Sequence, residues 1–118
     1  MKLWKVIRAR EAFYARKDVK LPAAVAYKIF KFCKEVDGDA FEFYREKLND
    51  TIKEFAIDVG GGQYQVPEEK QAAFTAAMAE IDELDVKAPD IAFTLQELDG
   101  LELSIADMAG LEDFLKEA

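Results

Sequence analysis

The chain has 118 residues, of which 51% are hydrophobic, and its formal net charge is −8 at pH 7. This composition suits one folded domain with a modest core and excludes a disordered or fibrous chain. No segment approaches the ~20 apolar residues that span a bilayer, and the N-terminus lacks the apolar centre of a secretory signal, so we expect a cytoplasmic protein without membrane contact.

Residues 1–20 are basic and are predicted to form a helix over about Leu3–Ala15. Residues 1–34 carry ten Lys or Arg against two acids, about +8, whereas residues 35–118 carry six against 22, about −16. The basic third could meet nucleic acid or an anionic partner, or could be neutralised by the acidic remainder within the fold or in a second copy. We favour neutralisation. Trp4 and Phe13 interleave with basic residues such as Arg8, a mixture that can stack bases and bind phosphates, but they also follow an ordinary helical face.

Residues 21–58 are predicted to form one long amphipathic helix that begins at Leu21-Pro22. From Val25 to Phe55, apolar residues recur every three or four positions without losing phase. A helix of about 35 residues is about 50 Å long, whereas a compact domain of this length has a radius of gyration of only ~13 Å. We therefore expect the helix to pack against the rest of the chain as a hairpin, against a second copy, or both.

Asp37-Gly38-Asp39 is the weak point of this helix. Glycine costs ~1 kcal/mol relative to alanine inside a helix, and Asp-Gly is also a turn signal, so two shorter helices are an alternative. We favour one continuous helix because the apolar phase is kept from Val36 to Ala40 across the glycine.

Residues 59–66 are predicted to form a glycine loop and a short strand, since Gly60–Gly62 end the helix and Gln63–Val66 alternates polar and apolar residues. Residues 67–118 form an acidic helical part. Its first helix, about Pro67–Leu84, is expected to fold back on the long helix. Val86 and Ile91–Phe93 could add short strands beside Tyr64, although so few residues give only a marginal sheet.

A final helix is predicted after Ser104, because Ser104 and Asp107 have the spacing of a capping box. Met108, Leu111, Phe114 and Leu115 would be its buried face. The chain as a whole is therefore predicted to be mainly α, a single domain over residues 1–118. Its long central helix is folded into a helical hairpin with short flanking helices and at most a minor two- or three-stranded β element.

The order of these features resembles a family of small, uncharacterised proteins of tailed phages and prophages. The segments that carry the resemblance are Leu21-Pro22, Tyr27-Lys28-Ile29, Phe43–Ile52 with Arg45, Tyr64-Gln65-Val66 after the glycines, Glu68–Leu84, Asp85-Val86, and Leu103-Ser104 with Asp107, Leu111 and Phe114-Leu115. The resemblance covers about the last 100 residues and implies a viral origin. It implies no activity and no catalytic residues, and it leaves out the basic N-terminal helix.

Enzyme chemistry is poorly supported, because the chain contains no histidine. This excludes His general bases, Ser-His and Cys-His nucleophile pairs and His-containing metal sites. The glycine triplet is not followed by Lys-Ser/Thr and is therefore not a phosphate loop. The single cysteine, Cys33, falls on the apolar stripe. We expect its thiol to be buried and to pack as a small hydrophobic side chain. We expect a non-enzymatic protein without catalytic residues, cofactor or metal.

Several functions remain open on the sequence alone. We favour a protein–protein interaction or assembly protein of phage type, forming a homo-oligomer or holding a phage or host protein. The alternative is an acidic inhibitor that presents carboxylates to a host nucleic-acid-binding protein. We disfavour nucleic acid as a partner and expect no small-molecule substrate. The candidate partner-binding residues are Trp4, Arg8, Phe13, Asp82, Glu83, Asp85 and Asp90.

Overall fold

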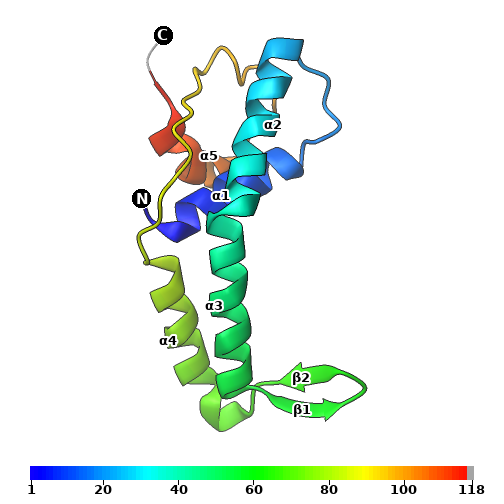
Figure 1. The fold of residues 1–118 in the computed structure, drawn as a ribbon, viewed down its shortest axis with the longest axis vertical. Coiled ribbons are helices and arrows are strands. Elements are labelled where there is room, and N and C mark those ends of the chain that lie inside the picture. The colour runs from blue at the N-terminus through cyan, green and yellow to red at the C-terminus, as the bar shows by residue number, and fades with distance from the viewer. Residues whose placement is uncertain (117–118) are drawn as a thin grey trace.

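Two helices joined end to end form a rod that runs along most of the molecule (Figure 1). The computed structural model describes residues 1–116, with α2 spanning Ala23–Gly38 and α3 spanning Ala40–Phe55. The molecule measures 50 × 28 × 25 Å and its Cα radius of gyration is 16.8 Å, larger than the ~13 Å of a compact domain of this length. The mainly helical fold class is confirmed.

The rod bends at Asp39 but does not reverse. Asp39 has φ −118° and ψ −83°, outside the helical region. Hydrogen bonds nevertheless continue across the bend, because the Asp39 N–H donates to the Glu35 carbonyl at 3.2 Å and the Phe43 N–H donates to the Asp39 carbonyl at 3.1 Å. The prediction of a continuous helix through Gly38 is therefore confirmed as one long bent helix over residues 23–55.

The lower half of the molecule is a helical hairpin of α3 and α4 (Gln71–Asp82), which pack against each other (Figure 1). A 3₁₀ turn, η1 (Glu68–Lys70), follows Pro67 and precedes α4. The Phe55 and Phe74 rings meet edge to face at 6.2 Å between centroids. The predicted return of this segment along the rod is confirmed, although α4 is shorter than the predicted Pro67–Leu84.

A β-hairpin of β1 (Ile57–Gly60) and β2 (Gln63–Gln65) joins the two helices and projects from the end of the rod (Figure 1). The prediction that the helix continued to residue 58 is wrong, because Ala56 is already extended, with φ −94° and ψ 150°. Gly60, Gly61 and Gly62 all have positive φ, which only glycine adopts readily. The resulting tight turn lets Ile57–Gly60 pair with β2 instead of continuing the helix.

The predicted strands at Val86 and Ile91–Phe93 do not join this sheet. The hairpin lies at one end of the rod, whereas α4 carries the chain away from it before residue 86 (Figure 1). These segments instead form single bridges, Lys2 with Asp85 and Phe93 with Leu115. The sheet therefore has two strands, and β2 ends at Gln65.

The core lies in the upper half, where α1 (Leu3–Tyr14) crosses the rod and packs on α5 (Ile105–Leu111) (Figure 1). The Phe32 ring is fully buried and its centroid lies 5.4, 5.7 and 4.8 Å from those of Phe13, Phe93 and Phe114. Such edge-on pairs add about 0.5–1.5 kcal/mol each beyond the burial of their area. These four rings join α1, α2, the segment after α4 and η2 (Glu112–Phe114).

The capping box at the start of α5 is confirmed. The Ser104 hydroxyl accepts a hydrogen bond from the Asp107 N–H at 3.0 Å, and the Ser104 N–H donates to the Asp107 carboxylate at 3.0 Å. These two bonds satisfy N–H groups that would otherwise lack a partner at the helix start. The cap matters because α5 has only seven residues.

Two glycines should respond oppositely to the same substitution. A Cβ at Gly38 meets nothing within 4 Å, and the φ of Gly38 is not positive, so Gly38→Ala should stabilise the protein by about 0.5–1 kcal/mol. A Cβ at Gly110 would lie 2.8 Å from the Arg8 Cβ and 2.9 Å from the Ala9 backbone N, so Gly110→Ala should destabilise it by about 1–3 kcal/mol. Urea unfolding followed by far-UV circular dichroism measures both. Changes of the same sign would contradict this packing.

Candidate partner-binding surfaces

The three candidate residues of α1 do not form one surface. Phe13 is only 3% exposed and packs in the aromatic core. Trp4 is half-buried and Arg8 is exposed, with the Arg8 guanidinium over the Trp4 ring at 5.6 Å from its centroid. Trp4 and Arg8 are therefore available to a partner, whereas Phe13 serves the core.

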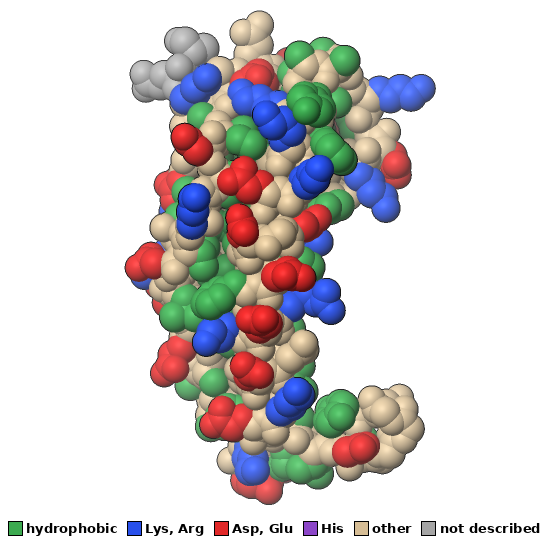
Figure 2. Space-filling model, in the orientation of Figure 1, with side chains coloured by type: hydrophobic (Ala, Val, Ile, Leu, Met, Phe, Trp, Pro, Cys, Tyr) green, Lys and Arg blue, Asp and Glu red, His purple; other side chains and the backbone are tan. Residues whose placement is uncertain are grey.

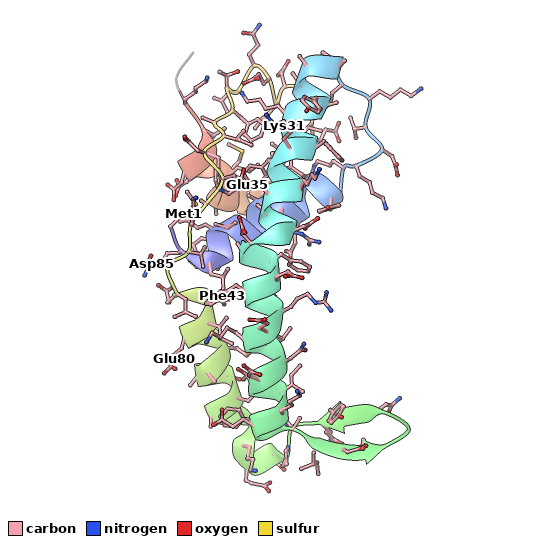
Figure 3. The ribbon with its side chains drawn as sticks, in the orientation of Figure 1. Met1, Lys31, Glu35, Phe43, Glu80 and Asp85 are labelled. Carbon is pink, nitrogen blue, oxygen red and sulfur yellow. The ribbon has the colours of Figure 1, made fainter. Side chains whose placement is uncertain are left out.

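The four acidic candidate residues do not act alike either, because two of them form ion pairs and two do not. Glu83 pairs with the Lys2 ammonium at 3.2 Å, and Asp85 lies 3.9 Å from the N-terminal amine of Met1. Figure 3 shows Met1 and Asp85 beside each other at the point where α4 leads into the upper half. Asp82 and Asp90 are exposed and form no ion pair within residues 1–116.

The ion pairs share one pattern among the described residues: each joins a positive group of residues 1–34 to a carboxylate of residues 35–116. Besides the two pairs of Glu83 and Asp85, they are Lys5 with Glu112 and Asp113, Arg10 with Asp37, Arg16 with Asp107, and Lys28 with Glu97. The predicted neutralisation is therefore confirmed for five of the ten Lys and Arg residues of this segment, and it takes place within the fold. Exposed pairs contribute little stability individually, so their common effect is to set how the basic and acidic parts face each other.

Three of these carboxylates have a pKa below the ordinary value. A hydrogen bond from the Thr94 backbone N–H and the Lys28 ammonium lower the pKa of Glu97. The Ser104 backbone N–H, with Arg16, lowers the pKa of Asp107. Burial raises the pKa of Asp37, but the Tyr14 hydroxyl and the Arg10 guanidinium, each donating at 2.5 Å, outweigh burial and lower it.

The first unpartnered surface is a groove of about 500 Å³ between the end of α1 and α2, which we call the α1–α2 groove. Phe13 and Cys33 are its buried residues, and burial raises the pKa of the Cys33 thiol to about 11. Phe30 is 59% exposed and Tyr14 39% exposed. The residues that line the groove are Phe13, Tyr14, Lys17, Ala26, Ile29, Phe30, Cys33, Lys34 and Asp37.

The second unpartnered surface is the β-hairpin, in which every residue from Ile57 to Gln65 is exposed. Ile57, Val59 and Tyr64 are 52%, 50% and 61% exposed. Figure 2 shows hydrophobic and acidic side chains on this projecting arm. Sequence reasoning assigned Ile57 to the helix and missed this surface, although alternating residues on both sides of the glycine triplet are a hairpin signal.

A third hollow lies at the bend of the rod and is acidic. It has a volume of about 590 Å³ and is lined by Gly38, Asp39, Ala40, Glu42, Phe43, Glu46, Asp85, Val86 and Lys87. Within residues 1–116, no three His, Cys, Asp or Glu side chains are arranged to hold a metal ion. The carboxylates of this hollow are therefore read as a charged surface.

Comparison of the chain with protein-family models, curated protein sequences and solved structures finds no match. Among residues 1–116, no helix combines the length and the apolar composition needed to cross a bilayer.

The capping aspartate gives a pH-dependent prediction. The folded pKa of Asp107 lies below the ordinary 3.8, so its charge stabilises the fold above that pH, and this contribution is lost as the pH falls through the folded pKa. Asp107→Asn should reduce the free energy of unfolding by about 1 kcal/mol at neutral pH, since a neutral acceptor replaces a charged one. The difference should shrink below about pH 4.

Chemical denaturation across pH measures this difference. Asp18→Asn, in the exposed segment between α1 and α2, is the matched control because Asp18 forms no ion pair within residues 1–116. A deficit in Asp107→Asn that stays constant down to about pH 2 would show that the charge of Asp107 is irrelevant to stability.

Proposed function

We propose that this protein is a non-enzymatic interaction and assembly protein that associates with a second copy of itself. The observation that carries the proposal is the poor coverage of the lower half. Only Ala40 and Thr51 are buried in α3, and only Ile81 is buried in α4. Phe43, Tyr44 and Leu48 on the apolar stripe of the rod are only partly buried. Two helices alone cannot enclose a core, so the stripe still exposes apolar area that a partner could cover.

The surface charge supports a protein partner over nucleic acid. The net charge is −8, which repels phosphates, and the ion pairs neutralise much of the basic segment. The exposed lysines that remain, such as Lys17 and Lys34, border the apolar α1–α2 groove. An apolar groove with a charged rim resembles a protein-binding surface.

The inhibitor hypothesis receives less support from the surface. It requires acidic side chains to be presented to a basic host protein, but Glu83, Asp85 and Glu97 are already paired with positive groups of the same chain. Of the four acidic candidate residues, only Asp82 and Asp90 form no ion pair within residues 1–116. The proposed location of the protein is the cytoplasm. The proposed phage or prophage origin rests on the residue pattern alone.

Size-exclusion chromatography with light scattering tests the proposal. The expected result is a species of twice the chain mass whose fraction rises with protein concentration. Leu48→Asp, on the apolar stripe, should shift the equilibrium to the monomer, whereas Asn49→Asp, on the exposed neighbouring position, should not. A monomer at all concentrations would overturn self-association, and a steeply salt-dependent shift with added DNA would favour a nucleic-acid binder.

A further inference from the structure

We propose that two copies dock antiparallel, each placing its β-hairpin in the α1–α2 groove of the other. The inference rests on the proposed self-association, in which the apolar stripe of α3 is one contact, and it adds a second contact between the β-hairpin and the α1–α2 groove. It commits to a second copy of this chain as the occupant of the groove.

The β-hairpin exposes apolar side chains on both faces. The register pairs Ile57 with Gln65 and Asp58 with Tyr64, and cross-strand partners lie on the same face. Ile57 therefore lies on one face and Tyr64 on the other, both more than half exposed. A two-stranded hairpin without a packing partner is marginally stable at best in water. Docking of one face on another protein surface would stabilise the hairpin.

The α1–α2 groove offers a matching apolar surface. Phe30 is 59% exposed at its edge, while Phe13 and Cys33 form its buried floor. Val19, in the segment that connects α1 to α2, is 44% exposed. Covering Phe30 with apolar side chains would remove apolar area from water, which favours association.

The hairpin cannot reach the groove of its own chain. The hairpin lies at the lower end of a molecule 50 Å long, whereas the groove lies along α2 in the upper half. Figure 1 shows the hairpin projecting to the same side of the rod as the segment that connects α1 to α2. A two-fold axis beside the rod and perpendicular to its length inverts the second copy. Each hairpin then faces the groove of the other copy, which gives a closed, isologous dimer.

The charges at the two surfaces are complementary. Asp58 is the only charged residue among residues 57–66. Lys17 and Lys34 are exposed groove residues that form no ion pair within residues 1–116. In the antiparallel dimer, the Asp58 carboxylate of one copy therefore approaches lysines of the other, twice by symmetry. Opposite charges across an interface fix orientation and exclude other arrangements.

Charge exchange between two variants tests this arrangement. Asp58→Lys alone should weaken the homodimer about tenfold at low salt, because each hairpin then meets two like charges. The double variant Lys17→Glu with Lys34→Glu should do the same. In an equal mixture of the two variants, both contacts of the heterodimer are attractive. Native mass spectrometry should therefore show that heterodimers make up more than the half of all dimers that random pairing would give.

A cysteine pair tests contact directly. In a Cys33→Ala background, the Ala26→Cys and Val59→Cys variants carry one thiol each at exposed positions, and mild oxidation of their mixture should give a disulfide-linked heterodimer. Thr75→Cys, exposed on α4, replaces Ala26→Cys as the matched control and should not link to position 59.

The outcomes separate the two proposals. Dimers of the unaltered protein without a link between positions 26 and 59, or without preference for the charge-exchanged heterodimer, overturn the docking geometry and leave self-association intact. Disulfides between two copies of Val59→Cys, formed in place of the heterodimer, would show that the two hairpins pair with each other. This result would also overturn the docking geometry. A monomer at every concentration overturns both proposals.

Discussion

The burial of α1 between the rod and α5 is the contact on which the rest of the structure depends. α1 contributes six of the sixteen buried hydrophobic residues found among residues 1–116. Its Phe13 ring contacts Phe32 of the rod and Phe93 of the segment after α4. On its other side, Gly110 allows α5 to approach the α1 backbone so closely that a methyl group would not fit. The rod also contacts the C-terminal segments directly, since Phe32 packs against Phe93 and Phe114, so α1 completes a core that all three parts share.

The position of α1 also explains the distribution of charge. A strongly basic segment at the centre of an acidic protein places its positive groups near carboxylates from α2, from the end of α4 and from α5. These pairs are partly exposed and contribute little energy individually, but all favour the same arrangement of the segments. Hydrophobic burial therefore supplies the stability, and charge complementarity favours one orientation of α1 over others.

In the same arrangement, the upper half of the molecule buries far more side chains than the lower half. The upper half encloses an aromatic core, whereas the lower half is a two-helix hairpin with few buried side chains and an exposed β-hairpin. The α1–α2 groove lies in the upper half and the β-hairpin at the lower end, so neither covers the other within one chain. This asymmetry supports association with another protein surface more strongly than any single residue does.

The sequence by itself determined the features that depend on neighbouring residues. Apolar periodicity predicted the rod, Ser104 and Asp107 predicted the cap, the glycine triplet predicted a turn, and the charge division predicted internal pairing. The tertiary structure alone decided that Phe13 is buried while Trp4 remains partly accessible, since both positions fit an amphipathic helix. It also decided that Ile57 leaves the helix to pair with Gln65, and which surfaces remain uncovered. These outcomes depend on contacts between residues far apart in the chain, which local pattern does not encode.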